Sequence, residues 1–366
     1  MFGGIYKNKK VLVTGHTGFK GSWLTTWLIN LGAEVVGISK DIPTAPSMFK
    51  ELKLEDKIKH YQDDIRDLAK IVGIVSSEQP DFLFHLAAQP IVSTSYKDPL
   101  ETISSNVMGT ANILEALKIS NHKCIAIMIT SDKAYDNVEQ IWGYKEDDKM
   151  GGKDIYSGSK GAAELIIKSY YHSFLKNENC NIRLSIGRAG NVIGGGDWAQ
   201  DRIVVDCMEA WDKKESVEIR SPDATRPWQH VLEPLSGYLS LGQALYKDNG
   251  LDGQAFNFGP KAEQNHTVKQ LIKDLSQYWS FLDKKSAFIV TDTIPFHEAS
   301  LLKLNCDKAL FYLKWQANLE YEFTIKFTSE WYYDFYNSDK SMLNKTVEQI
   351  TEYENIAQNK GLIWTD

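Results

Sequence analysis

The chain has 366 residues, of which 43% are hydrophobic and 24% are charged, a balance typical of a globular protein with roughly two domains. Its net charge of -7 argues against a nucleic-acid-binding surface, because proteins that bind duplexes present basic faces. No apolar run approaches the ~20 residues that a membrane-spanning helix needs, so no membrane partner is expected.

The cysteines and the N-terminus predict a compartment. Cys124, Cys180, Cys207 and Cys306 are too far apart in sequence to form a zinc cage, so no metal is expected. Scattered cysteines fit a reducing environment, where disulfides are rare. The N-terminus lacks an apolar segment followed by a cleavage site. We therefore expect a cytoplasmic protein.

Strands and helices alternate in the first half of the sequence. Residues 10–14 and 34–38 are short β-branched runs, and residues 21–31 between them carry apolar side chains at helical spacing, which predicts a βαβ unit. Further strands are predicted at 82–88, 124–130 and 181–186, and helices at 101–119 and 156–174. The alternation predicts an α/β fold of the Rossmann type, with a doubly wound parallel sheet and helices on both faces.

The pattern changes after about residue 190, where glycine, tryptophan and charged residues become dense. Residues 255–258 are expected to return to the sheet. We therefore expect a Rossmann domain formed by residues 1–190 and about 231–258. A smaller C-terminal lobe for the substrate would comprise about 191–230 and 259–366.

A glycine-rich loop follows the first predicted strand. Gly15, Gly18 and Gly21 form the spacing G-x-x-G-x-x-G between a strand and a helix, which is the context of a dinucleotide pyrophosphate site. Gly15 is expected to make the turn, Gly18 to admit the pyrophosphate, and Gly21 to let the helix pack on the strand. The predicted cofactor contacts in this loop are Gly15, Thr17, Gly18, Phe19, Lys20 and Gly21.

The acid that would bind the cofactor ribose is less clearly marked. Asp41 is the acid nearest to the end of the second strand, but Ser39 or Lys40 also suits the position, which leaves NAD and NADP both open. Asp64 and Ile65 are expected to follow the third strand, where an acid meets the adenine amine. A solvated loop acid is the alternative for Asp64.

Tyr156 and Lys160 form a Y-x-x-x-K pair. Positions i and i+4 share one face of a helix, and a lysine ammonium beside a phenol favours the phenolate. Such a phenolate can take a proton from a sugar hydroxyl as hydride leaves the same carbon. By spacing alone the pair is usually a surface feature. Its place after an apolar strand, in a chain with a dinucleotide loop, favours catalysis.

The words TGHTGFKG, HLAAQ and YSGSK together resemble the extended short-chain dehydrogenase/reductase family from the N-terminus to about residue 259. The longer words TSDKAY, AGNVIGGGDWAQDR and RPWQHVLEPLSGYL resemble its nucleotide-sugar 4,6-dehydratases. The resemblance implies bound NAD, CDP-glucose as the small-molecule substrate, and a homodimer or homotetramer. Cytosine specificity rests on this resemblance alone.

The resemblance also assigns roles to the three residues at the end of the predicted strand 124–130. Ser131 would bond the sugar 4-hydroxyl, Asp132 would be the general acid for the departing 6-hydroxyl, and Lys133 stands where most dehydratases have a glutamate that removes the carbon-5 proton. A free lysine has a pKa near ~10.4 and is a poor base at neutral pH. Lys133 as base and Lys133 as a charge that stabilises the enolate therefore both remain open.

The remaining site residues follow from the family pattern. Further cofactor contacts are expected at Leu86, Ala87, Ala88, Gln89, Asn106 and Thr130. Substrate contacts are expected at Asn191, Trp198, Arg202, Arg226, Asn257 and His297, with the two arginines on the pyrophosphate. For Trp198 a place in the core is the stronger alternative.

Two other functions compete. An epimerase or another nucleotide-sugar dehydratase would share this scaffold, but an epimerase needs no acid at carbon 6, so Asp132 and Lys133 argue against it. A catalytically silent NAD-binding scaffold would typically lose Tyr156 or Lys160, and this chain keeps both.

Overall fold

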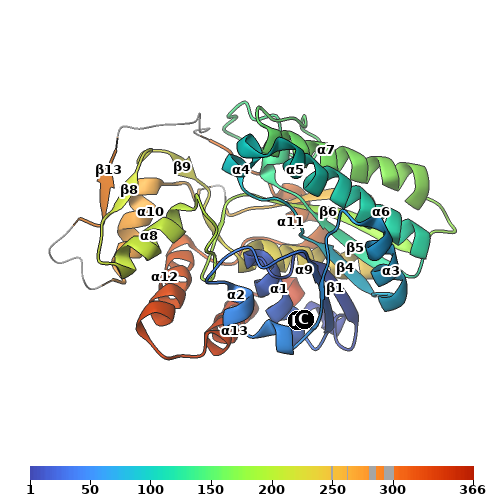
Figure 1. Cartoon of the computed structure of the whole chain (residues 1–366), viewed down its shortest axis with the longest axis horizontal. Coiled ribbons are helices and arrows are strands. Elements are labelled where there is room, and N and C mark those ends of the chain that lie inside the picture. Colours follow the sequence, from blue (N-terminus) through green and yellow to red (C-terminus); the bar gives the residue numbers. More distant parts are fainter. Residues whose placement is uncertain (249, 262, 280–285, 292–300) are drawn as a thin grey trace.

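The computed structural model describes the chain except residues 249, 262, 280–285 and 292–300. Its centre is a seven-stranded sheet with the order β11-β6-β5-β4-β1-β2-β3, in which every neighbouring pair is parallel (Figure 1). The strands are β1 (Lys10–Thr14), β2 (Glu34–Ser39), β3 (Lys59–Gln62), β4 (Phe82–His85), β5 (Cys124–Ile129), β6 (Ile182–Ala189) and β11 (Ala255–Phe258). The expected doubly wound α/β fold is confirmed.

Helices cover both faces of the sheet, which explains why the central strands β1, β4 and β5 are mostly apolar. One face carries α3 (Leu68–Glu78), α6 (Gly109–Ser120) and α7 (Ile155–Tyr170), and the other carries α1 (Phe19–Asn30) and α9 (Leu232–Lys247) (Figure 1). Successive strand residues point to opposite faces. In β1, Leu12 therefore packs with the first set of helices, while Val11 and Val13 pack with the second.

The strand order reverses beside β1, because β2 and β3 lie on one side of it and β4, β5, β6 and β11 lie on the other. Ligands of doubly wound sheets bind at such a switch point, beyond the carboxyl ends of the strands. The glycine loop after β1 and the residues after β4, β5 and β6 all leave the sheet at this edge.

The elements away from the sheet lie at the left of Figure 1. They include α8 (Ile203–Asp212), α10 (Val268–Ser276) and α12 (Tyr321–Asn337), with the strand pairs β8 (Val217–Ile219) with β13 (Phe288–Val290) and β9 (Thr225–Arg226) with β12 (His266–Thr267). A third short pair, β7 (Val192–Ile193) with β10 (Gln229–His230), lies between the lobe and the sheet. The division of the chain into a Rossmann domain and a lobe at the expected residues stays a prediction.

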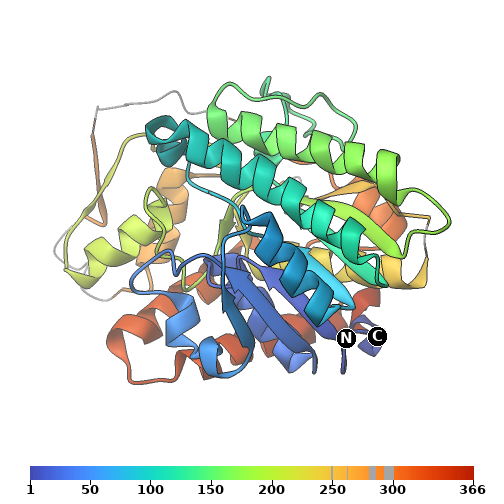
Figure 2. The ribbon, with the colours of Figure 1, turned by 45° about the vertical axis from the view of Figure 1, so that its right-hand side comes forward.

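Parts of the C-terminal segment also contact the Rossmann elements. Helix α11 (Asp307–Leu313) packs on β11 and α9, and α13 (Met342–Asn359) packs on α1. The termini lie together (Figure 2), and the Gly3 amide donates to the Asp366 carbonyl at 2.6 Å. Within the described ranges, no helix combines the length and apolar character needed to cross a bilayer.

The predicted helix at 101–119 is confirmed, and the structure adds a π-helical stretch within it that the sequence pattern did not reveal. Helix α5 (Pro99–Ile103) passes through a π-helical turn at Ser104–Met108 before α6 begins. The turn brings Asn106 inward, where its side chain contacts Gln89 and Ser159. Tertiary contacts of this kind override the local helical pattern, and π-turns often mark functional sites. The short helices α2 (Met48–Glu51) and α4 (Val92–Lys97) complete this half.

Candidate active site

The glycine loop has the geometry of a dinucleotide cradle. Gly15 has φ +74°, and a Cβ there would lie 2.8 Å from the Ala87 amide nitrogen, so the tight turn requires glycine. A Cβ on Gly21 would lie 2.1 Å from the Gly15 carbonyl oxygen, which shows how closely α1 approaches the loop. A Cβ on Gly18 would meet nothing closer than 3.5 Å. The space beside Gly18 is therefore left for something other than this chain.

The N-terminus of α1 points at that space. Gly18 is the N-cap and supplies no side-chain cap, so the first helical amides are available to an anion. Thr17 is fixed by its hydroxyl, which donates to the Asp41 carbonyl at 2.7 Å, and Phe19 lies against Gly194. These features fit the pyrophosphate of a dinucleotide.

The end of β2 narrows the choice for the ribose position. The Ser39 hydroxyl is buried and bonds the His16 ring at 3.1 Å. Lys40 pairs with Glu101 at 2.9 Å, and the Asp41 side chain is 58% exposed. Asp41 is therefore the residue of the three whose side chain is best placed to accept hydrogen bonds from a ribose.

Asp64 is not a free acid. Its carboxylate accepts hydrogen bonds from the Arg66 Nε at 3.0 Å and the Arg66 Nη2 at 2.6 Å, and the Arg66 guanidinium lowers its pKa. Ile65 is buried against Gly109, and its carbonyl accepts from Asn112. An adenine amine would have to compete with Arg66 for Asp64, a pairing that the sequence reading did not anticipate.

The segment after β4 is fixed by a polar network. Asn106 accepts from the Gln89 amide at 2.7 Å and donates to the Ser159 hydroxyl at 2.8 Å, which ties the loop at Leu86–Gln89 to α7. Asn106 is only 2% exposed. The Ala87 amide is held by the Thr14 hydroxyl at 3.2 Å. Asn106 thus positions Gln89 relative to α7, and the backbone of Leu86 and Ala87 lies directly against Gly15.

The catalytic residues predicted from the sequence meet at the ends of β5 and α7. The Ser131 hydroxyl donates to the Asp132 carboxylate at 2.9 Å and caps the short turn that contains Lys133. Ser131 also forms a hydrogen bond that lowers the pKa of Tyr156. The Asp132 carboxyl is buried against Gly190, and burial raises its pKa, as a general acid requires.

The expected lowering of the Tyr156 pKa is not found in the protein without ligands. We expected Lys160 to lower the pKa of the phenol, but burial outweighs every nearby charge and raises it to about 12. Burial also lowers the pKa of Lys160 to about 8. The Lys160 Nζ lies 5.9 Å from the centre of the Tyr156 ring. Lys160 is still mostly charged at neutral pH, but its charge does not offset the burial of Tyr156, so the phenol needs a further positive charge in the site.

A buried ion pair that the sequence analysis missed lies behind these residues. Arg188 on β6 and Glu164 on α7 form a bidentate pair with both side chains fully buried. The Thr130 hydroxyl donates to Glu164 at 2.6 Å, so the carboxylate joins the end of β5 to the helix of Tyr156. The signal in the sequence is an arginine near the end of a predicted buried strand, where an unpaired charge would be costly.

The predicted substrate residues fall into two groups. Asn191 lies between β6 and β7, and its side chain has no hydrogen-bond partner among the described residues. Arg202 caps α8, and its buried Nε also lacks a described partner. The positive charge of Arg202 lowers the pKa of Tyr156 and also lowers the pKa of Lys20. These two side chains are suitably placed for a polar ligand.

Asn257 and Trp198 are placed elsewhere. Asn257 is fully buried, accepts from the Tyr135 hydroxyl at 2.8 Å and donates to the Tyr144 carbonyl at 2.8 Å, so its amide is consumed by the fold. Trp198 packs in an aromatic cluster with Trp331, as its core alternative predicted. The expectation that Asn257 contacts substrate is therefore corrected.

Arg226 and His297 complete the predicted set. Arg226 lies in β9 and donates to the Thr225 carbonyl at 2.8 Å. His297 lies outside the described residues. Nothing in the part of the chain that the structure covers gathers three or more potential metal ligands.

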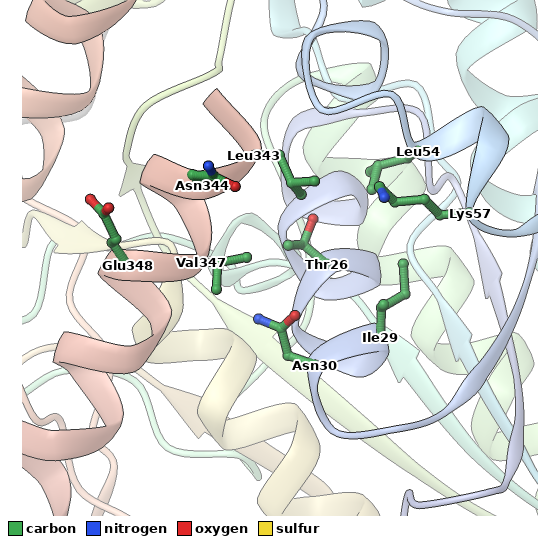
Figure 3. A pocket seen from close by; sticks show the side chains of 9 residues that line it. All are labelled: Thr26, Ile29, Asn30, Leu54, Lys57, Leu343, Asn344, Val347 and Glu348. Atoms are coloured by element: carbon green, nitrogen blue, oxygen red, sulfur yellow. The ribbon is translucent and has the colours of Figure 1, made fainter. Parts of the chain in front are cut away.

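Two cavities lie at different places in the molecule, and only one of them is next to the predicted catalytic residues. A small cavity of about 10 Å³ lies beside Asp132 and Gly190, between the sheet and the lobe. A pocket of about 370 Å³ lies between α1, the turn at Leu54–Asp56 and α13 (Figure 3). Its lining includes Thr26, Lys57 and Glu348 and none of the predicted catalytic residues. The larger of these two cavities is therefore not the candidate active site.

Comparisons with known proteins agree with this geometry. The chain is 42% identical over 352 residues to the CDP-glucose 4,6-dehydratase of Salmonella typhimurium, which covers 95% of this chain and 97% of the relative. It is 25% identical to the CDP-paratose 2-epimerase of Salmonella typhi over 74% of this chain and 84% of that protein.

Solved structures show the same fold. The UDP-glucose 4-epimerase of Thermotoga maritima superposes with a TM-score of 0.76 at 22% identity, covering 89% of this chain and 99% of that one. The dTDP-glucose 4,6-dehydratase DesIV of Streptomyces venezuelae also gives 0.76, at 17% identity, covering 89% and 97%. The model of the GDP-mannose 4,6 dehydratase family matches residues 12–328. This chain belongs to the GDP-mannose 4,6 dehydratase family.

Proposed function

We propose that this protein is a CDP-glucose 4,6-dehydratase that converts CDP-D-glucose into CDP-4-dehydro-6-deoxy-D-glucose and water. The observation that carries the proposal is the buried acid Asp132, which accepts a hydrogen bond from Ser131, the residue that is also hydrogen-bonded to Tyr156. Dehydration at carbon 6 needs an acid there, and epimerisation does not. The 42% identity over nearly the whole length of both chains supports the CDP-sugar as substrate.

NAD is the proposed cofactor, since the glycine loop and the open N-terminus of α1 fit its pyrophosphate. When bound, it would accept hydride from carbon 4 of the sugar and return it to carbon 6. No arginine follows β2 to hold a 2′-phosphate, and Lys40 is already paired with Glu101, which favours NAD over NADP. Tighter binding of NADP in a direct titration would contradict this choice.

The residues of the chain supply the proton transfers. Tyr156 takes the proton of the 4-hydroxyl as the carbon is oxidised, with Ser131 holding the same hydroxyl. The ketone acidifies the hydrogen on carbon 5, which Lys133 or a neighbouring group removes. Asp132 protonates the departing 6-hydroxyl, which leaves as water. These roles follow from the resemblance to nucleotide-sugar 4,6-dehydratases, and the hydrogen bonds of Ser131 with Asp132 and Tyr156 support them.

We also propose that the protein acts as a homodimer or homotetramer. Exposed apolar side chains occur on α5, on α7 and on the π-helical stretch between α5 and α6, three elements that contact one another; they include Leu100 (75% exposed), Met108 (54%) and Leu165 (56%). Apolar surface of this kind on packed helices suits contact with a second copy.

The function is tested by incubating the protein with CDP-glucose and a trace of NAD. We expect a 4-keto-6-deoxy sugar in molar excess over the NAD, with no net reduced nicotinamide. UDP-, GDP- and dTDP-glucose serve as controls and should react far more slowly. Stoichiometric accumulation of reduced nicotinamide would instead indicate a simple dehydrogenase, and a faster UDP- or dTDP-sugar would indicate a different dehydratase.

A further inference from the structure

Residues 131–134, the catalytic turn, are held at both ends by one buried ion pair. Thr130 comes directly before the turn, and its hydroxyl donates to Glu164 Oε1 at 2.6 Å. Tyr135 comes directly after the turn, and its hydroxyl accepts from Arg188 Nη1 at 2.5 Å. Arg188 and Glu164 are bonded to each other, with Arg188 Nε 2.7 Å from Glu164 Oε1. The two flanks of the catalytic turn are therefore joined through a single charged pair.

The same pair fixes the catalytic turn against α7. Glu164 lies on this helix, about one turn after Lys160 and about two turns after Tyr156. Arg188 lies in β6, the neighbour of β5 in the sheet, and it also donates to the Glu146 carbonyl at 2.9 Å. The end of β5, the helix of Tyr156 and the strand β6 thus meet at this pair.

The burial of the pair indicates that it does more than stabilise the fold. Arg188 and Glu164 are both 0% exposed, and Tyr135 is 1% exposed. Removing two charges from water costs free energy that their attraction offsets only when hydrogen bonds satisfy the remaining donors and acceptors. An apolar pair of similar size often stabilises a protein as well or better. Hydrogen bonds that end on both flanks of the catalytic turn point instead to a requirement of geometry.

We propose that Arg188 and Glu164 are positioning residues, which clamp the catalytic turn so that its serine meets the same sugar hydroxyl as Tyr156. The proposal rests on the dehydratase function above. In the oxidation, the proton of the 4-hydroxyl passes to Tyr156 while hydride leaves carbon 4 for NAD. This step needs Ser131 and Tyr156 together, one from each side of the clamp. Water loss depends on Asp132, which lies inside the turn, so the clamp should matter most for the oxidation.

The test measures the oxidation of carbon 4 in single turnovers of CDP-glucose at saturating NAD, followed by the absorbance of reduced nicotinamide. Thr130→Val removes one tie of the clamp, and Tyr135→Phe removes the other together with its bond to Asn257. Each should slow the oxidation about tenfold, because small misplacements of reacting groups are costly, while both ligands bind as before. Thr130→Ser keeps the hydroxyl and should restore most of the rate.

Deuterium at carbon 4 of CDP-glucose gives a second measurement. In Thr130→Val and Tyr135→Phe, hydride removal should limit turnover, so the isotope effect on kcat should be larger than in the wild type. A change that only loosens the fold would leave this isotope effect where it is.

Two matched controls remove buried hydroxyls elsewhere. Thr328 on α12 donates to the Thr324 carbonyl at 2.8 Å, and Tyr6 donates to the Leu239 carbonyl at 2.7 Å. Thr328→Val and Tyr6→Phe each lose one buried hydrogen bond, as the clamp variants do, so the melting temperature should fall by a similar amount. The oxidation rate should stay at the wild-type value in both controls.

Glu164→Leu with Arg188→Met removes both charges at once and leaves neither of them buried without a partner. This double variant should fold, since apolar replacements of a buried pair are often tolerated, and it should oxidise carbon 4 roughly a hundredfold more slowly. If it does not fold, Thr130→Val and Tyr135→Phe decide the question.

Three results would overturn the proposal. A lowered melting temperature with a wild-type oxidation rate in Thr130→Val and Tyr135→Phe would leave the pair a purely structural role. Loss of NAD affinity in Thr130→Val, with a normal rate at saturation, would make the hydroxyl a cofactor ligand. Equal loss of rate in Thr130→Ser would show that the methyl group packs and the hydroxyl does not matter. A wild-type protein without turnover of CDP-glucose would refute the proposed function, whereas unaffected variants of an active wild type would refute only the clamp.

Discussion

At the residue scale, the site depends on burial as much as on its chemical groups. Tyr156 is 7% exposed and its pKa is about 12, so the phenol is protonated at neutral pH in the chain alone. Lys160 has a lowered pKa for the same reason. Activation of Tyr156 must therefore come with the ligands, and a positively charged nicotinamide ring would supply the missing charge.

Tyr156→Phe removes the phenolic oxygen and little else. We expect the oxidation of carbon 4 to slow by roughly 10²–10⁴, the usual contribution of an acid-base group. NAD affinity should stay near the wild-type value, because the glycine loop is untouched. Rapid-mixing kinetics and a NAD titration measure the two effects. A variant that turns over at nearly the wild-type rate would exclude Tyr156 from the mechanism.

Lys133→Met separates the two roles left open for Lys133. If Lys133 is the carbon-5 base, the sugar should stall as the 4-ketone, reduced nicotinamide should accumulate on the enzyme, and exchange of the carbon-5 hydrogen with deuterated water should vanish. If it only stabilises the enolate, exchange should slow but persist.

Asp132→Asn is the matched control for this experiment. It keeps the shape of the side chain but loses the acid, so carbon-5 exchange should survive while water loss fails. Normal dehydration by Lys133→Met would show that the glutamate position does not carry over to Lys133. The base would then be sought first at Asp132, the adjacent carboxylate.

At the scale of elements, the glycines in the turn from β1 into α1 have two different roles. Gly21 is needed for close packing, whereas Gly18 leaves space for a ligand. Gly18→Ala should leave the melting temperature almost unchanged, because its Cβ would have no neighbour nearer than 3.5 Å, yet it should weaken NAD binding. Gly21→Ala should lower the melting temperature markedly, because its Cβ would lie 2.1 Å from the Gly15 oxygen. Thermal unfolding with and without NAD measures both. The reverse order of effects would contradict the assigned roles.

The same elements show what the sequence could predict. Strand runs such as 10–14 and 124–130 are apolar because both sheet faces are covered, so short-range patterns located them within a few residues. The glycine loop and the pair Tyr156 and Lys160 were found because their spacing is local.

Features that depend on distant partners could not be predicted. The π-turn at Ser104–Met108 exists because Asn106 bonds Gln89 and Ser159. Asn257 is drawn into the fold by Tyr135 and Tyr144, and burial decides the pKa of Tyr156. These contacts join residues that are far apart in the sequence, so no local pattern of residues predicts them.

At the scale of the whole molecule, the oligomeric state can be tested independently of catalysis. If the exposed apolar residues on α5 to α7 mediate self-association, the protein should sediment as a dimer or tetramer at micromolar concentration. Leu100→Glu with Leu165→Glu should shift it to monomer by placing charges in an apolar contact. Replacing two exposed residues on α11, Phe311→Glu with Tyr312→Glu, is the control and should not. A wild-type monomer would refute the assignment.

The whole account depends on hydride leaving carbon 4 and returning to carbon 6 of the same sugar. CDP-glucose labelled with deuterium at carbon 4 tests this most directly, with the product analysed by NMR. The account predicts one deuterium in the new methyl group at carbon 6 and none released to solvent. Deuterium lost to water, or retained on free nicotinamide, would contradict it.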